Sequence, residues 1–215
     1  MLVAALTGNY GMGKSTVLKM FRDLGAITLD ADKVVDALLE DAAVLRKVRE
    51  SFGNAVFSKG GGIDRAALAA IIFRDKEERD ALEGILHPLV FERIEAFLEK
   101  TGERKADGKV VIVEIPLLFE KGYTRRFYRK ITVYTDEEIA LKRLGKKGIA
   151  REMAMSRLEA QIPIKDKIRM ADFSIDNSGT QGETERQVRE IYGKLLADSK
   201  GMREQGLTAG LNKDD

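Results

Sequence analysis

The sequence predicts an α/β fold, in which a five-stranded parallel sheet is flanked by helices. Three observations support this fold class. Five short apolar segments rich in β-branched residues are separated by stretches with helical periodicity. The apolar segments lack polar alternation, which is typical of strands buried on both faces of a parallel sheet. A glycine-rich turn follows the first of these segments and precedes a helical pattern.

The expected elements alternate along the chain, as crossovers in a parallel sheet require. The strand candidates are residues 2–7, 26–30, 110–115, 130–135 and 173–176. Helical patterns cover residues 14–24, 31–52, 65–73, 76–86, 88–100, 136–144, 151–161 and 183–196.

The connection between the second and third strands is far longer than a simple crossover needs. We therefore predict an inserted helical, substrate-binding domain at residues 33–105, within a core formed by residues 1–32 and 106–198. A second excursion precedes the last strand and predicts a small basic lid at residues 140–168. Its neighbourhood is rich in cations: Lys142, Arg143, Lys146, Lys147, Arg151, Arg157, Lys165, Lys167 and Arg169. Residues 199–215 are polar and aperiodic, which predicts a disordered tail.

Composition excludes several classes of protein. The formal net charge of the 215-residue chain is +2, which gives no global case for binding nucleic acid. The absence of cysteine excludes disulfides and thiolate metal sites. The first apolar run is too short for a signal peptide or a membrane span and has no basic segment before it. We expect a soluble cytoplasmic protein without a membrane partner; the sequence does not indicate an oligomeric state and is compatible with a monomer.

The turn "GNYGMGKS" matches the pattern G-x-x-x-x-G-K-[ST], and we call residues 8–15 the P-loop. Glycines at Gly8, Gly11 and Gly13 let backbone N–H groups converge on a phosphate chain, and the helix that follows directs its positive end at the same anion. In this motif, Lys14 would reach the β- and γ-phosphates and the Ser15 hydroxyl would bind Mg²⁺. The loop predicts a site for a nucleoside triphosphate.

Two carboxylates favour a kinase. In "LDADKV", Asp30 and Asp32 lie at the end of the second strand, where such sheets bind ligands, and there they would orient a hydroxyl acceptor, take its proton and help to place Mg²⁺. Helix N-capping is the alternative role for both residues. The GTPase-like strings at Asp176 ("DNSG") and Asn212 ("NKDD") are attributed to chance, since one follows the last strand and the other lies in the tail.

The basic excursion suits a lid that closes over a triphosphate and stabilises the charge that develops during phosphoryl transfer. We expect a phosphate contact from at least one of Arg143, Lys147 and Arg151. The alternative is a solvated cationic surface.

Six segments, taken in order, resemble the dephospho-coenzyme A kinase family: "LTGNYGMGKST", "LGAITLDADKV", "LHPLV", "VIVEIPLLFE", "LKR" and "ADFSIDNSG". The resemblance runs from Leu2 to about Tyr192. It implies a P-loop core, a helical coenzyme A-binding domain and a lid. It also implies ATP-dependent, Mg²⁺-dependent phosphorylation of the ribose 3′-hydroxyl of dephospho-coenzyme A, the last step of coenzyme A synthesis.

The resemblance also implies roles for single residues. Asp32 becomes the base for the 3′-hydroxyl, and Asn177 lies near adenine. His87 borders the acceptor site, although a histidine before proline can equally be a structural cap. Leu117 lines the acceptor pocket or packs in the core with its neighbours Leu118 and Phe119. The amides of Gly11, Met12, Gly13, Lys14, Ser15 and Thr16 form the phosphate cradle.

Three positions need separate expectations. Glu114 stands where many P-loop proteins have aspartate. Because glutamate is longer, we expect its contact to Mg²⁺ to be mediated by water and not direct. In the lid, Lys146 or Lys147 replaces the arginine expected after "LKR", which keeps the charge without the two-pronged contact. Glu120 is expected to be exposed.

Two other functions remain open from the sequence. A nucleoside monophosphate kinase would share the core and lid but accept a phosphate. A nucleotide-dependent binding or switch protein would hydrolyse slowly and act through a partner. The long helical insertion disfavours the switch, and the carboxylate at Asp32 favours a hydroxyl acceptor over a phosphate acceptor.

Overall fold

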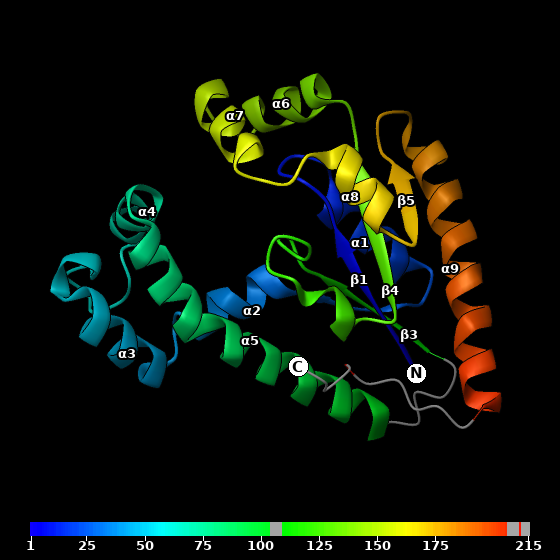
Figure 1. Ribbon diagram of the computed structural model, residues 1–215, viewed down its shortest axis with the longest axis horizontal. Coiled ribbons are helices and arrows are strands. Elements are labelled where there is room, and N and C mark those ends of the chain that lie inside the picture. The colour runs from blue at the N-terminus through cyan, green and yellow to red at the C-terminus, as the bar shows by residue number, and fades with distance from the viewer. Residues whose placement is uncertain (104–108, 206–210, 212–215) are drawn as a thin grey trace. The chain divides into compact units, whose positions relative to one another are not determined.

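The computed structural model describes residues 1–103, 109–205 and 211. Its sheet has the strand order β2-β3-β1-β4-β5, and every neighbouring pair is parallel (Figure 1). The strands are β1 (Leu2–Thr7), β2 (Ile27–Asp30), β3 (Val110–Glu114), β4 (Arg129–Tyr134) and β5 (Phe173–Asp176). The predicted fold class is confirmed, with strand bounds within one residue of those expected.

The helices are α1 (Lys14–Asp23), α2 (Ala31–Leu38), α3 (Ala42–Phe52), α4 (Arg65–Arg74), α5 (Lys76–Glu103), α6 (Glu137–Gly145), α7 (Arg151–Glu159), α8 (Ile164–Met170) and α9 (Gln181–Glu204). Short 3₁₀ turns lie at η1 (Asn54–Val56) and η2 (Tyr123–Arg126). The chain divides into two compact units, one formed by residues 1–30 with 99–215 and the other by residues 31–98. No described helix has the length and apolar character that a membrane crossing requires.

One face of the sheet carries α1 and α9, which also pack against each other. Strand side chains two residues apart point to this face, as the pleat dictates. The core here consists of Leu2, Ala4, Leu6, Val110, Ile112, Ile131, Val133 and Ile175 from the strands, with Val17, Phe21, Val188, Ile191 and Leu195 from the two helices. The buried sheet holds the carboxyl ends of β1, β3 and β4 in fixed register, and this edge carries the P-loop.

In the second unit, two helix boundaries differ from expectation. The single helix expected over 31–52 is two helices, because the Asp41 carboxylate accepts N–H bonds from Ala43 and Val44 and so starts a new helix. The break expected before Pro88 is absent, and α5 continues through it. The helix retains a continuous apolar face there, with Leu82, Leu86, Val90, Ile94 and Leu98 all buried.

In the first unit, α8 was not expected, and α9 is longer at both ends than expected. The prediction of disorder from residue 199 is wrong for its first part, because α9 continues to Glu204. Ser199 is buried and its hydroxyl lies 3.5 Å from the Lys109 carbonyl oxygen. Residues 206–210 and 212–215 of the expected tail lie outside the described part of the chain.

Candidate nucleotide-binding site

The P-loop connects β1 to α1, and three of its glycines adopt positive φ angles: 148° at Gly8, 79° at Gly11 and 89° at Gly13. The surroundings also exclude a side chain at these positions. A Cβ at Gly8 would overlap the Val133 carbonyl oxygen, and one at Gly11 would lie 2.9 Å from Leu144 Cδ1. The backbone therefore approaches its neighbours at distances that only glycine permits.

Gly13 is the N-cap residue of α1, so no side chain caps the first turn of this helix. Its first-turn N–H groups and helix dipole thus favour an anion at this point. Ser15 and Thr16 are exposed on that turn. The Lys14 ammonium donates to the Asn9 carbonyl oxygen at 3.4 Å, which places it across the loop. The arrangement is that of a phosphate cradle with a cation beside it.

Asn177, just after β5, braces the loop from behind. Its side-chain N–H donates to the Met12 carbonyl oxygen at 2.9 Å, and its Oδ1 accepts the Thr184 hydroxyl at 3.2 Å. The Met12 sulfur accepts the Thr135 N–H at 3.1 Å, so the same loop residue also contacts the end of β4. Asn177 is buried, and its side-chain amide links the P-loop to α9.

Of the three cations expected to contact phosphate, Arg143 is the one with a hydrogen bond beside the P-loop. Its Nη2 donates to the Asn177 carbonyl oxygen at 2.8 Å, and its buried Nη1 has no hydrogen-bond partner. This Nη1 would be 3.5 Å from a Cβ at Gly13. Lys147 is exposed, and Arg151 pairs with Glu138 at 2.6 Å. The structure thus brings Arg143 to the loop, whereas Arg151 is engaged elsewhere.

Helices α6 and α7 pack on the P-loop through a small apolar cluster that contains Met12, Ala140, Leu141, Leu144, Ala154 and Leu158. Arg157 of α7 stacks over the Tyr10 ring at 5.0 Å and donates to its hydroxyl at 3.0 Å. Part of the basic excursion therefore contacts the loop rather than facing solvent.

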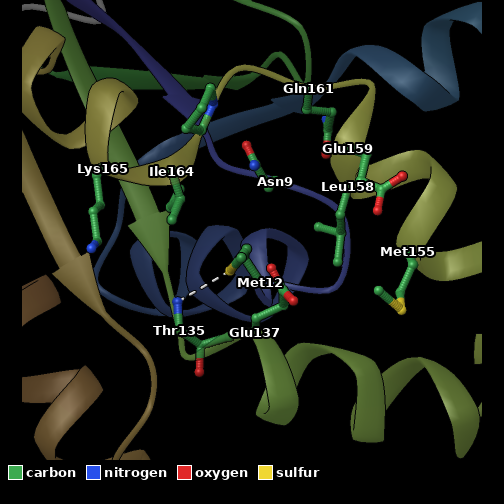
Figure 2. Close-up of a pocket in the computed structure, with 11 residues that line it drawn as sticks. Asn9, Met12, Thr135, Glu137, Met155, Leu158, Glu159, Gln161, Ile164 and Lys165 are labelled. Carbon is green, nitrogen blue, oxygen red and sulfur yellow. Dashed lines mark hydrogen bonds between the residues drawn. The ribbon is translucent and has the colours of Figure 1, made fainter.

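A cavity of about 350 Å³ lies between the P-loop, the end of β4, α7 and the start of α8 (Figure 2). Its apolar lining includes Met12, Leu158 and Ile164, and its polar lining includes Asn9 and Gln161. The Asn9 Oδ1 atom is buried without a hydrogen-bond partner.

Carboxylates lie at the same edge of the sheet. Asp30 ends β2 and is in register with Glu114 at the end of β3. Glu114 is buried and is also in register with Leu6 of β1. Asp32 lies in the first turn of α2, in the second unit, and is exposed.

The remaining sequence candidates fall in both units. Leu117 is half-buried and Leu118 is fully buried after β3. His87 is half-buried within α5 of the second unit.

The expectation that Glu120 is exposed is wrong. Glu120 forms an ion pair at 2.6 Å with Lys167, a member of the basic excursion whose side chain has no exposed surface. Burial lowers the pKa of Lys167, and the hydrogen bond and charge of Glu120 oppose this shift. No local pattern marks this pair, because its two members are brought together only by the packing of α8.

The described residues contain no group of three or more His, Cys, Asp or Glu side chains arranged for a metal. Ser15, exposed at the start of α1 beside the glycine cradle, still fits a Mg²⁺ ion that keeps water and phosphate oxygens as its other ligands.

The strand order, the glycine cradle and the uncapped helix together define a P-loop kinase type of nucleotide-binding protein. The family model for dephospho-CoA kinase matches residues 2–183. The chain belongs to this family.

Individual relatives agree with this assignment. The chain is 39% identical to the dephospho-CoA kinase of Aquifex aeolicus, over 90% of this chain and 97% of the relative. It is 41% identical to that of Geobacillus kaustophilus, over 88% and 94%. The solved structure of the Campylobacter jejuni dephospho-CoA kinase aligns with a TM-score of 0.64 at 31% identity, over 93% of this chain and 98% of that one. A Thermus thermophilus crystal structure aligns with a TM-score of 0.76 at 32% identity, over 90% and 97%.

Proposed function

We propose that this protein transfers the γ-phosphoryl group of ATP, with Mg²⁺, to the ribose 3′-hydroxyl of dephospho-coenzyme A. The observation that carries this proposal is the glycine cradle at the start of α1 in a chain that belongs to the dephospho-CoA kinase family. Residues 33–105, most of which form the second unit, would supply the acceptor-binding domain. His87 would border the acceptor site, and Leu117 would line the acceptor pocket.

In this proposal, backbone N–H groups from Gly11 to Thr16 hold the phosphates, and Lys14 carries charge to the β- and γ-phosphates. Mg²⁺, held through the Ser15 hydroxyl, would neutralise charge on the β- and γ-phosphate oxygens. Arg143 would act beside the loop, and Lys147 would reach the transferred group when the lid closes. Asn177 would act through Met12 on the shape of the cradle as well as near the adenine.

Asp32 is the proposed base. It follows β2 by two residues, at the carboxyl edge where parallel α/β sheets bind ligands. Its carboxylate would accept the hydrogen bond of the 3′-hydroxyl, orient the oxygen toward the phosphorus and take the proton as the new bond forms. Phosphoryl transfer requires positioning and charge stabilisation more than covalent catalysis, so these placements would supply most of the rate.

The acceptor is tested by measuring ADP release from Mg·ATP with dephospho-coenzyme A and, separately, with a panel of nucleoside monophosphates. We expect turnover with dephospho-coenzyme A alone. Turnover only with a monophosphate would contradict the proposed acceptor, and acceptor-independent hydrolysis would favour a switch protein.

The base is tested with Asp32→Asn. We expect the affinity for Mg·ATP to stay unchanged while kcat falls about 10²–10⁴-fold, the usual contribution of a general base. Asp36→Asn is the matched control, because Asp36 lies on the same helix and pairs with Arg65 on the protein surface. If Asp32→Asn retains a kcat near that of the control, Asp32 is not the base.

A further inference from the structure

The chain between α7 and α8 is tied to the P-loop by hydrogen bonds, and we call residues Gln161–Pro163 the lid-exit segment. The Tyr10 N–H donates to Gln161 Oε1 at 2.8 Å. The Asn9 side-chain N–H donates to the Ile162 carbonyl oxygen at 3.1 Å. Two consecutive P-loop residues, Asn9 and Tyr10, therefore bond to two consecutive residues of the segment.

The other side of the lid-exit segment is held from the region after β3. The Ile162 N–H donates to Glu120 Oε1 at 3.2 Å, and the same oxygen lies 2.6 Å from Lys167 Nζ. The Lys167 carbonyl oxygen accepts the Thr132 hydroxyl at 3.2 Å, which fastens α8 to β4. A continuous path of polar contacts thus runs from the sheet through α8 and Glu120 to the P-loop.

Packing alone does not fix this region. The cavity of about 350 Å³ is lined by Asn9 and Gln161, both labelled in Figure 2, so each of these residues lacks neighbouring atoms on its cavity side. Asn9 is nevertheless only 4% exposed. Where dispersion contacts are missing on one side, directional hydrogen bonds decide the conformation of Asn9 and Tyr10, which form the first turn of the P-loop.

We propose that Gln161 and Glu120 are positioning residues: they hold the lid-exit segment against the first turn of the P-loop and thereby keep its amides aimed at the nucleotide phosphates. This inference rests on the proposed function, because it assumes that the P-loop binds the phosphates of ATP. It assigns neither residue a contact with substrate, and it predicts an effect on nucleotide affinity that is separate from stability.

Gln161→Leu tests the first contact, since it keeps the size of the side chain and removes the oxygen that accepts the Tyr10 N–H. Glu159→Leu is the matched control, because Glu159 lines the same cavity. We expect the Kd for Mg·ADP to rise about five- to tenfold in Gln161→Leu, as for the loss of one hydrogen bond. Amide exchange at Tyr10 should become faster, whereas the KM for dephospho-coenzyme A should match that of the control.

Two double variants test Glu120. Both Glu120→Gln/Lys167→Met and Glu120→Leu/Lys167→Met remove the buried charges together, so neither leaves one ion without its partner. Only the glutamine keeps an oxygen that can accept the Ile162 N–H. We expect the glutamine variant to bind Mg·ADP within about twofold of wild type and the leucine variant about five- to tenfold more weakly.

The proposal is overturned if Gln161→Leu and its control bind Mg·ADP equally, or if the two double variants do. Should a double variant fail to fold, the Gln161→Leu comparison decides alone. A wild-type protein that does not bind Mg·ADP or Mg·ATP would contradict the proposed function itself. Normal wild-type binding with no loss in the variants would contradict only the positioning role.

Discussion

Gly13→Ala is the substitution whose cost the structure defines most closely. Gly13 has φ 89° and ψ 25°, a left-handed conformation that costs an L residue about 1–2 kcal/mol. Its new Cβ would overlap the Asn177 side-chain nitrogen, which donates to the Met12 carbonyl oxygen. Displacing that amide leaves a buried carbonyl without a donor, at a cost of about 1–3 kcal/mol. The sum is about 2–5 kcal/mol of folding free energy.

Gly122→Ala separates the two contributions. Gly122 has φ 72° and ψ 14°, nearly the same backbone conformation, and a Cβ there would meet nothing within 4 Å. It should therefore lose only the backbone cost of about 1–2 kcal/mol. Both glycines belong to the unit that contains the sheet, so the same unfolding transition reports on both.

Urea denaturation of wild type and both variants measures these costs. We expect Gly13→Ala to be less stable than Gly122→Ala by about 1–3 kcal/mol. On the proposed function, Gly13→Ala should also weaken Mg·ATP binding at least about tenfold, while Gly122→Ala leaves it unchanged. If the two free energies of unfolding agreed within about 0.5 kcal/mol, the steric account of the loop would be refuted, since independent changes of this kind add to about that precision.

Three further outcomes are expected. Glu120→Gln should lower the free energy of unfolding by about 3–5 kcal/mol, because it leaves the Lys167 ammonium buried without its partner. Urea denaturation measures this loss. A loss below about 1 kcal/mol is typical of an exposed pair and would contradict the burial of this one. Burial lowers the pKa of Lys167 below its usual 10.5, so the folded protein loses that proton at a lower pH than the unfolded chain. The stability of wild type relative to Lys167→Met, measured by urea denaturation, should therefore rise with pH between the folded pKa and 10.5 and stay constant below that window. Arg143→Lys should raise the Kd for Mg·ADP, measured by calorimetry, because lysine lacks the planar guanidinium that bonds to the Asn177 carbonyl oxygen. Lys147→Met should lower kcat and leave this Kd unchanged. If Arg143→Lys lowered only kcat and Lys147→Met raised only the Kd, the roles of the two residues would be exchanged.

Local signals predicted the strands and the P-loop because each carries its own pattern. The apolar runs at Leu2–Thr7 and Phe173–Asp176 match the observed strands, and the glycines of the P-loop have the positive φ angles that their chemistry requires. The Asp41 cap was also readable in principle, since aspartate before a new apolar period starts a helix, but the longer helical pattern obscured it. At Pro88 the sequence predicted a helix break that the structure does not have. The continuous buried face of α5 outweighs the backbone hydrogen bond that proline cannot donate.

The contacts that brace the candidate site could not be read from local pattern. Glu120 and Lys167 meet only after β3, β4 and α8 have packed, and a lysine in a cation-rich stretch normally faces solvent. The same holds for Gln161, whose side chain caps a P-loop amide far away in the sequence. The residues proposed to bind phosphate follow a sequence motif, whereas the residues that shape the loop are brought to it by three-dimensional packing.

The place of β1 in the sheet has a consequence for how the protein emerges from the ribosome. All six residues of β1 are buried, and its two neighbours are β3 and β4. β1 precedes the other strands of this sheet in the chain, so it has no hydrogen-bonded neighbour until Val110–Glu114 has followed, and its second flank stays open until Arg129–Tyr134 has been made. During that interval an apolar segment with open edges is exposed on the nascent chain, which makes β1 a natural place for a chaperone to bind and a point where slowed translation would promote aggregation.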